Sequence, residues 1–369
     1  MNKLSITLVV GARPNFMKMA PIIRELEKLD KIFNYRLIHT GQHRSIKMNE
    51  VFFNELGMPP PHLYLKSKGE TSVEKIAGIM EEFEKECLNN FPDIVLVVGD
   101  VNSTLACSIV SKKLNIKLVH IEAGLRSGDS QMPEEINRII TDSISDLFFV
   151  TEPSGVDNLI NEGHNLNRIH YVGNVMIDNL FYQKEKLDNS RDIYFSTSKL
   201  KNKLKKYAVV TLHRPSNVDN IDVFSGIIQA INQISLSLPV IFPVHPRTRK
   251  NINKFNIKFN DNIFLIEPLS YLEFLNLWKD AEIVLTDSGG LQEETTALSV
   301  PCNTIRNNTE RPITVSEGTN TVVGTDPTNI LNAFKETINK KRLKVTSIKF
   351  WDGDAAARIV EQLKNFNYE

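Results

Sequence analysis

The chain has 369 residues, 41% hydrophobic and 24% charged, which is the composition of a globular protein long enough for two domains. Lys plus Arg and Asp plus Glu each number 44, so no net charge favours nucleic acid or an acidic membrane as a partner. Three cysteines, Cys87, Cys107 and Cys302, lack metal-ligand spacing, and we interpret them as core thiols in a reducing compartment.

The first apolar run, LSITLVV at 4–10, is predicted to be a β-strand. It is too short for the core of a signal peptide or for a membrane span, and no small-residue cleavage site follows it. The sequence therefore predicts a cytoplasmic protein.

Strand-like runs then alternate with amphipathic helical stretches along the whole chain. Continuous apolar strands of this kind are typical of parallel sheets that helices cover on both faces. The further runs lie at 35–40, 93–100, 116–124, 146–153, 168–174, 207–214, 239–246, 262–270, 281–290 and 300–306. The pattern predicts an α/β fold with two doubly wound domains in tandem.

A polar, lysine-rich stretch at 174–206 separates the two halves. We place the boundary near Gly173, so that residues 1–173 form the first domain and residues 174–349 the second. The last segment, 350–369, is predicted to be a helix that packs back on the first domain.

Polar side chains of the first half follow its strands, where ligands bind in open α/β sheets. Asp100 and Glu122 end two successive strands separated by one crossover helix, and such strands are commonly neighbours. Glu134 opens the next helix, so several carboxylates would share one crevice, where crowding raises the pKa of at least one to suit proton transfer. The alternative is structural, with Asp100 capping a helix and Glu134 complementing a helix N-terminus. Nearby cationic residues are Arg13, Lys18, Arg126 and Arg138.

The second half contains TDSGGLQEET at 286–295, in which a strand, a glycine turn and a helix start follow one another. The turn at Ser288-Gly289-Gly290 presents backbone N–H groups that suit phosphate, although the same residues suit an ordinary βα turn. His213 and His245 end two other strands, each beside an arginine, and Arg311 lies in a loop after another strand. These groups could hold a diphosphate, and the absence of HExxH, CxxC and DxD patterns predicts no metal.

Nine segments in order resemble the motifs of the non-hydrolysing UDP-N-acetylglucosamine 2-epimerase family. They are GARPNFMKMAPIIREL, GQHR, VVGDVNST, HIEAGLRSGD, MPEEINR, VGNVMID, TLHRPSNVD, TDSGGLQEE and NNTERPITV, and they extend from about residue 6 to the C-terminal helix. The resemblance implies two Rossmann-like domains arranged as in the glycosyltransferase-B fold, with the active site in the interdomain cleft. It also implies a homodimer without a cofactor.

The resemblance further implies reversible C2 epimerisation of UDP-N-acetylglucosamine to UDP-N-acetylmannosamine, for cell-surface polysaccharide precursors. UDP would be eliminated to give 2-acetamidoglucal and then added back. By similarity, Asp100, Glu122 and Glu134 transfer protons, on faces of C2 that the sequence leaves open, and His213 assists departure of the diphosphate. Glu294 resembles the ribose ligand, and Glu293 is expected to cap the helix or face solvent. The other substrate-binding residues are Arg13, Lys18, Arg138, His245, Ser288, Gly289, Gly290 and Arg311.

The sequence departs from the common family pattern at three places, which are residues 214–217, Ile313 and residues 45–47. The first two leave open a modified UDP-amino sugar as substrate, and the third leaves open whether a regulatory second UDP-N-acetylglucosamine binds. Three alternatives remain: a hydrolysing 2-epimerase that releases N-acetylmannosamine and UDP, a glycosyltransferase, which needs an acceptor, and a nucleotide-sugar sensor without turnover.

Overall fold

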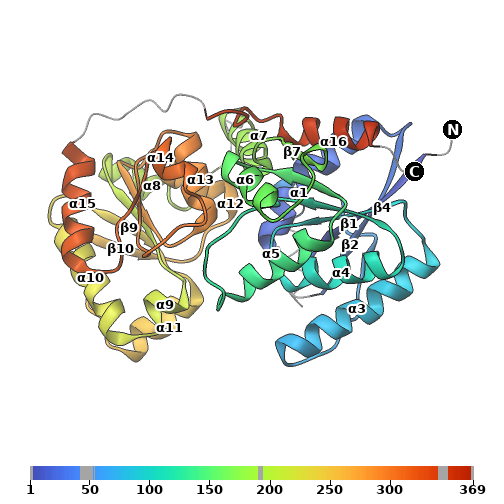
Figure 1. The fold of residues 1–369 in the computed structure, drawn as a ribbon. Helices are drawn as coiled ribbons and strands as arrows, with labels where there is room; N and C mark the ends of the chain where they lie inside the picture. Colours follow the sequence, from blue (N-terminus) through green and yellow to red (C-terminus); the bar gives the residue numbers. More distant parts are fainter. Residues whose placement is uncertain (1–2, 42–52, 54, 190–193, 340–347, 367–369) are drawn as a thin grey trace. The chain divides into compact units, whose positions relative to one another are not determined.

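The chain forms two compact units, one of Met1–Tyr182 with Lys349–Glu369 and one of Gln183–Ile348. The structure, a computed structural model, describes residues 3–41, 53, 55–189, 194–339 and 348–366 (Figure 1). Each unit is an α/β structure built on one parallel sheet, as the alternating strand and helix patterns predict.

The first unit contains a seven-stranded parallel sheet in the order β3-β2-β1-β4-β5-β6-β7. Its strands are β1 (Leu4–Val10), β2 (Phe33–His39), β3 (Leu63–Tyr64), β4 (Ile94–Val98), β5 (Lys117–Ile121), β6 (Leu147–Val150) and β7 (Ile169–Tyr171). Its helices are α1 (Arg13–Lys28), α3 (Ser72–Asn89), α4 (Asn102–Lys113), α5 (Pro133–Ile144), α6 (Pro153–Asn161), η1 (Leu166–Arg168), most of α7 (Val175–Asn189) and α16 (Ala355–Asn365). The strand order reverses direction between β1 and β4, and ligands bind at such a reversal in doubly wound sheets.

Alternating side chains of β1 divide the first unit's core into two layers. Ile6 and Leu8 join one cluster with residues of α1 and α16, whereas Val9 joins another with residues of α3 and α4. Strands buried on both faces have to be apolar throughout, which is why LSITLVV reads as a continuous apolar run.

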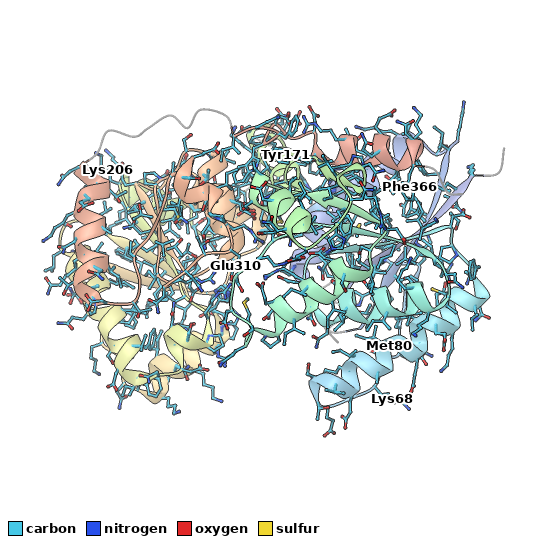
Figure 2. The ribbon with its side chains drawn as sticks, in the orientation of Figure 1. Lys68, Met80, Tyr171, Lys206, Glu310 and Phe366 are labelled. Carbon is cyan, nitrogen blue, oxygen red and sulfur yellow. The ribbon has the colours of Figure 1, made fainter. Side chains whose placement is uncertain are left out.

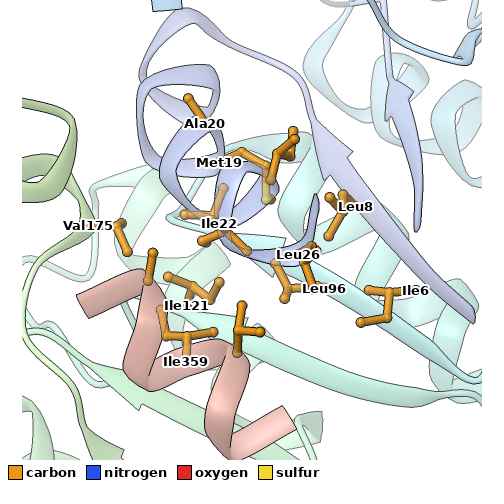
Figure 3. Close-up of a cluster of buried hydrophobic side chains, with 14 of the residues drawn as sticks. Ile6, Leu8, Met19, Ala20, Ile22, Leu26, Leu96, Ile121, Val175 and Ile359 are labelled. Atoms are coloured by element: carbon orange, nitrogen blue, oxygen red, sulfur yellow. The ribbon is translucent and has the colours of Figure 1, made fainter. Parts of the chain in front are cut away.

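The C-terminal helix α16 belongs to the first unit and packs against α1. Figure 3 shows Ile359 of α16 in one cluster with Ile22 of α1. The Asp178 carboxylate of α7 accepts the N–H groups of Ala355 and Ala356, at 3.2 and 2.7 Å, and so caps the helix.

The division between the units falls within α7, after Tyr182, and not near Gly173. The first part of α7 is held in the first unit because Val175 lies in that unit's core and Asp178 caps α16. Pattern reading could place the end of the last strand but not the packing of the helix that follows it.

The second unit contains a six-stranded parallel sheet in the order β10-β9-β8-β11-β12-β13. Its strands are β8 (Ala208–Thr211), β9 (Val240–Pro243), β10 (Ile263–Ile266), β11 (Ile283–Thr286), β12 (Cys302–Thr304) and β13 (Asn320–Val322). Its helices are α8 (Ser198–Leu204), α9 (Pro215–Val218), α10 (Ile221–Ser235), α11 (Pro246–Lys254), α12 (Tyr271–Trp278), α13 (Gly289–Ala297), α14 (Ile313–Ser316) and α15 (Pro327–Asn339). Here the order reverses between β8 and β11, whose registered ends are Thr211 and Thr286.

All three cysteines are buried and unpaired. Within the described part of the chain, every helix is too short or too polar to cross a membrane.

We expect Ile359→Ala to lower the free energy of unfolding of the first unit by about 2–5 kcal/mol, because it leaves a cavity in a filled core. Urea unfolding followed by tryptophan fluorescence measures the loss, since Trp351 precedes α16 and is buried. Ile160→Ala is the control, because Ile160 is 44% exposed. Equal losses in the two variants would show that α16 is not docked on α1.

Candidate active site

The reversal point of the first sheet holds an ion pair between Lys18 of α1 and Glu122, which follows β5. Both side chains are largely buried, at 11% and 6% exposure. Glu122 has a left-handed backbone with φ of 67°, a strained conformation for a residue other than glycine. The N–H groups of Glu122 and Ala123 both donate to the Phe149 carbonyl, at 3.0 and 3.1 Å, which holds the turn in that conformation.

Gly99, after β4, leaves the space in which this ion pair lies. A Cβ atom on Gly99 would stand 3.3 Å from both Glu122 Oε2 and Lys18 Nζ, and the residue has φ of 69°. Asn15 fixes the neighbouring β1–α1 turn, because its Oδ1 accepts the Ala12 N–H at 2.9 Å and its Nδ2 donates to the Val98 carbonyl at 3.0 Å. The two strand ends are therefore tied together.

Asp100 forms an ion pair with Arg138 of α5, whose Nη2 and Nε lie 2.7 and 3.1 Å from Asp100 Oδ2. The same guanidinium binds Glu135 at 2.5 Å. Burial raises the pKa of Glu135, but the N–H groups of Ser127 and Gly128 that it accepts, together with Arg138, outweigh burial and hold the pKa below its usual value. Asp100 does not cap α4, because the N-cap residue is Val101.

Two further predicted residues of the first unit stand apart from these pairs. Glu134 lies partly exposed in the first turn of α5 and has no hydrogen-bond or ion-pair partner among the described residues. Arg13 is the first residue of α1, but its side chain lies outside what the structure describes, as do residues 45–47. The structure thus joins Lys18 to Glu122 and Arg138 to Asp100.

Asp287, directly after β11, organises the second unit's site. It is fully buried, and its carboxylate accepts the backbone N–H groups of His213 and Arg214 at 3.0 and 2.9 Å. His213 Nδ1 lies 2.8 Å from Asp287 Oδ1. Sequence reasoning missed this residue, although an acid directly after an apolar strand and one position before the Ser288 turn was a readable signal.

The charge on Asp287 fixes the state of the His213 ring. Burial raises the pKa of Asp287, but His213 and the two backbone donors outweigh it, so the pKa lies below its usual value and the group is ionised. Nδ1 of His213 then carries a proton toward Asp287, and Nε2 is the ring nitrogen that can face a ligand. The His213 side chain is 42% exposed, so a ligand can reach it.

His245 lies beside His213, with ring centroids 5.8 Å apart. Its Nδ1 accepts the Arg247 N–H at 3.2 Å, which caps α11, and burial followed by repulsion from His213 lowers the pKa of His245. Both rings border a pocket of about 170 Å³ at the carboxyl ends of β8, β9 and β10. Its lining is Thr211, Leu212, His213, Pro243, His245, Pro268, Leu269 and Phe274.

The N-terminus of α13 is open, as an anion site requires. Ser288 is the N-cap residue and makes no side-chain cap, and a Cβ atom on Gly289 would meet nothing within 4 Å. The first N–H groups of a helix have no acceptor inside it, and the helix dipole adds positive potential there. Because Asp287 precedes Ser288 and binds His213, the imidazole lies beside this helix end.

The two adjacent glutamates of α13 are both buried, at 2% and 4% exposure. The expectation that Glu293 caps the helix or faces solvent is wrong, because its carboxylate pairs with Arg311 Nε at 2.7 Å. Glu294 accepts a hydrogen bond from the Tyr271 hydroxyl at 2.6 Å. Burial raises the pKa of Glu294 to about 7, although the hydrogen bond from Tyr271 acts to lower it.

The loop that carries Arg311 is held by a second buried pair that the sequence reading missed. Arg306 binds Glu310 through both terminal guanidinium nitrogens, Nη1 and Nη2, at 2.8 and 2.6 Å (Glu310 is labelled in Figure 2). Burial opposes ionisation of Glu310, but Arg306 outweighs it and lowers the pKa of Glu310 to about 2. Across the described residues, no three His, Cys, Asp or Glu side chains are grouped to hold a metal ion.

Residues 24–364 match the sequence family described as UDP-N-acetylglucosamine 2-epimerase. The chain is 42% identical to UDP-N-acetylglucosamine 2-epimerase of Methanococcus maripaludis, over 96% of this chain and 97% of that one. It is 36% identical to UDP-2,3-diacetamido-2,3-dideoxy-D-glucuronate 2-epimerase of Pseudomonas aeruginosa, over 98% and 99%. The crystal structure of the Methanocaldococcus jannaschii UDP-GlcNAc 2-epimerase with UDP-GlcNAc and UDP is similar at 40% identity and a TM-score of 0.88, over 98% and 100%.

We expect the stability of the protein without ligand to fall as the pH rises from about 4.5 to about 7, because Glu294 keeps its proton in the folded state but loses it in the unfolded chain. The loss from this group is roughly 3 kcal/mol. Glu294→Gln cannot ionise and should lack this component. Urea midpoints at pH 5 and pH 8 measure it.

Glu267→Gln is the control for this measurement, because the Glu267 side chain is 86% exposed. It should follow the wild-type pH dependence. A Glu294→Gln variant that loses stability in parallel with the wild type would contradict the raised pKa.

Proposed function

Because the chain belongs to the UDP-N-acetylglucosamine 2-epimerase family, we propose that it interconverts UDP-N-acetylglucosamine and UDP-N-acetylmannosamine. The observation that carries the proposal is His213, held by the buried Asp287 beside the open N-terminus of α13. That arrangement provides a proton donor and an anion site for a departing diphosphate, in a chain whose other unit supplies carboxylates.

The proposed reaction is an elimination followed by re-addition. C2 of the sugar has no adjoining carbonyl, so removal and return of its proton alone would be difficult. In the first step a base takes the C2 proton, the electron pair of that bond forms the C1–C2 double bond, and the C1–O bond breaks with its electrons on UDP. In the second step UDP adds back to C1 while C2 receives a proton on its other face. No water is consumed, which distinguishes the reaction from hydrolysis.

We assign the proton transfers to Asp100, Glu122 and Glu134. Lys18 and Arg138 hold the first two carboxylates in fixed directions, which general acid–base catalysis requires. Glu134, without a partner among the described residues and partly exposed, is available to a substrate.

We assign UDP binding to the second unit. The N–H groups at Gly289 and Gly290 suit the diphosphate, and Nε2 of His213 can donate to the oxygen that leaves C1. Glu294 suits the ribose hydroxyls, and the pocket that His213 and His245 border offers mostly apolar walls to a flat pyrimidine ring.

A modified UDP-amino sugar is the second candidate substrate. The observation that favours it is the 36% identity to the Pseudomonas aeruginosa 2-epimerase, whose name gives a diacetamido uronic acid as substrate. Comparing turnover of the two substrates by the purified protein separates these candidates.

We expect incubation with UDP-N-acetylglucosamine in deuterated water to give an equilibrium mixture with the manno epimer, carrying deuterium at C2. The exchange follows because the C2 proton leaves the sugar when the glucal forms. NMR of the sugar detects both results. Formation of the epimer with protium retained at C2 would contradict the elimination mechanism. Free N-acetylmannosamine as the main product would indicate the hydrolysing reaction.

We expect Asp100→Asn, Glu122→Gln and Glu134→Gln each to lower kcat by about a hundredfold or more, since each keeps its shape but cannot carry the proton. UDP affinity, measured by calorimetry, should change little because UDP is assigned to the other unit. Glu81→Gln, at an exposed position of α3, is the control. Near wild-type kcat in all three folded variants would show that these carboxylates do not transfer the proton.

A further inference from the structure

A chain of charged and polar side chains, buried at His120 and Asp142, contacts the two turns that carry Asp100 and Glu122. His120, on β5, is fully buried, and its Nδ1 lies 2.6 Å from Asp142 Oδ1 of α5. Asp142, also fully buried, binds Arg126 through Oδ2 at 2.8 Å. Arg126 in turn binds both oxygens of Glu162, at 2.8 and 2.6 Å.

Hydrogen bonds hold the His120 ring at both nitrogens. Its Nε2 lies 2.9 Å from the Gly99 carbonyl, which can only accept, so Nε2 carries a hydrogen and donates it. Nδ1 and Asp142 Oδ1 share a second hydrogen bond. Burial raises the pKa of Asp142, but His120 and Arg126 outweigh burial and leave the pKa below its usual value.

This chain of side chains binds one backbone group in each of the turns that carry Asp100 and Glu122. The His120 Nε2 donates to the carbonyl of Gly99, the residue before Asp100. Asp142 Oδ2 accepts the N–H of Gly124, two residues after Glu122, at 3.1 Å. The side chains of His120 and Asp142 thus join the end of β4 to the turn after β5 and fix the distance between them.

The turn after β5 needs such a brace because the backbone of Glu122 is strained. Gly99, Glu122 and Gly124 all have left-handed φ angles, of 69°, 67° and 77°. A left-handed residue other than glycine costs roughly 1–2 kcal/mol, so it persists only where surrounding bonds determine it. An uncompensated buried charge is costly too, so breaking the chain at either member would disturb both turns.

We propose that His120 and Asp142 are positioning residues, which hold the turns of Asp100 and Glu122 at the spacing that proton transfer at C2 requires. This inference rests on the proposed function. It gives the buried His120 ring a role that no contact with substrate could supply, since its side chain has no exposed surface.

Asp142→Asn tests the proposal, because an amide keeps the carboxylate's shape but carries no charge. We expect kcat to fall at least tenfold, up to about a hundredfold, as it does when catalytic groups are slightly misplaced. KM and UDP affinity should stay within about twofold because the change touches geometry and not binding. Asp146→Asn, which removes an ion-paired aspartate at the opposite end of β5, is the matched control and should retain wild-type kcat.

Nitrogen NMR of histidine-labelled protein tests the hydrogen bonds on which the inference depends. The wild type should show an N–H at Nε2 of His120, which donates to the Gly99 carbonyl, and its signal should shift in Asp142→Asn. The loss of kcat with KM unchanged is the readout that a merely structural role would not give. A wild type without that Nε2–H, or a folded Asp142→Asn variant with kcat within about twofold of wild type, overturns the inference.

Arg126→Gln covers the case in which Asp142→Asn does not fold, because Asp142 still retains His120 in that variant. It should lower kcat by about fivefold with unchanged UDP affinity, and unchanged kcat would overturn the inference. If the wild-type protein does not epimerise, the proposed function fails, and the NMR result still decides whether His120 holds the Gly99 carbonyl.

Discussion

A buried carboxylate is stable only when donors replace the water it loses, and both units meet this requirement with a histidine. Asp142 and Asp287 are each fully buried, and each binds one imidazole and backbone N–H groups of a turn after a parallel strand. Exposure separates their roles. His120 is sealed and can only brace the backbone, whereas His213 is 42% exposed and can act on a ligand.

The same requirement determines the partners of the cations in the second unit's loops. Inside the fold, Arg306 pairs with Glu310 and Arg311 pairs with Glu293. The N-terminus of α13, beside His213, makes no side-chain cap. In a chain with no net charge, an anion bound there would be held by local geometry and not by composition.

Strain and rigidity go together at the first unit's site. Glu122 occupies a left-handed backbone beside Gly99, which leaves room for the Lys18 ammonium. A side chain on Gly99 would contact that ion pair. The strained backbone of Glu122 and the missing Cβ of Gly99 therefore both allow the Lys18–Glu122 ion pair to form. Residues held this way cluster at functional sites because their neighbours have to over-determine them.

The sequence by itself predicted the α/β fold, the parallel strands and the polar residues that follow them, because apolar runs and turn residues are local signals. It could not predict that Glu293 pairs with Arg311, that Asp287 holds His213, or that His120 pairs with Asp142. Those facts depend on which strands are neighbours and which side chains lose contact with water. Tertiary structure decided them because a charged group takes its partner from residues that crossover connections bring close, at a sequence distance that no local pattern records.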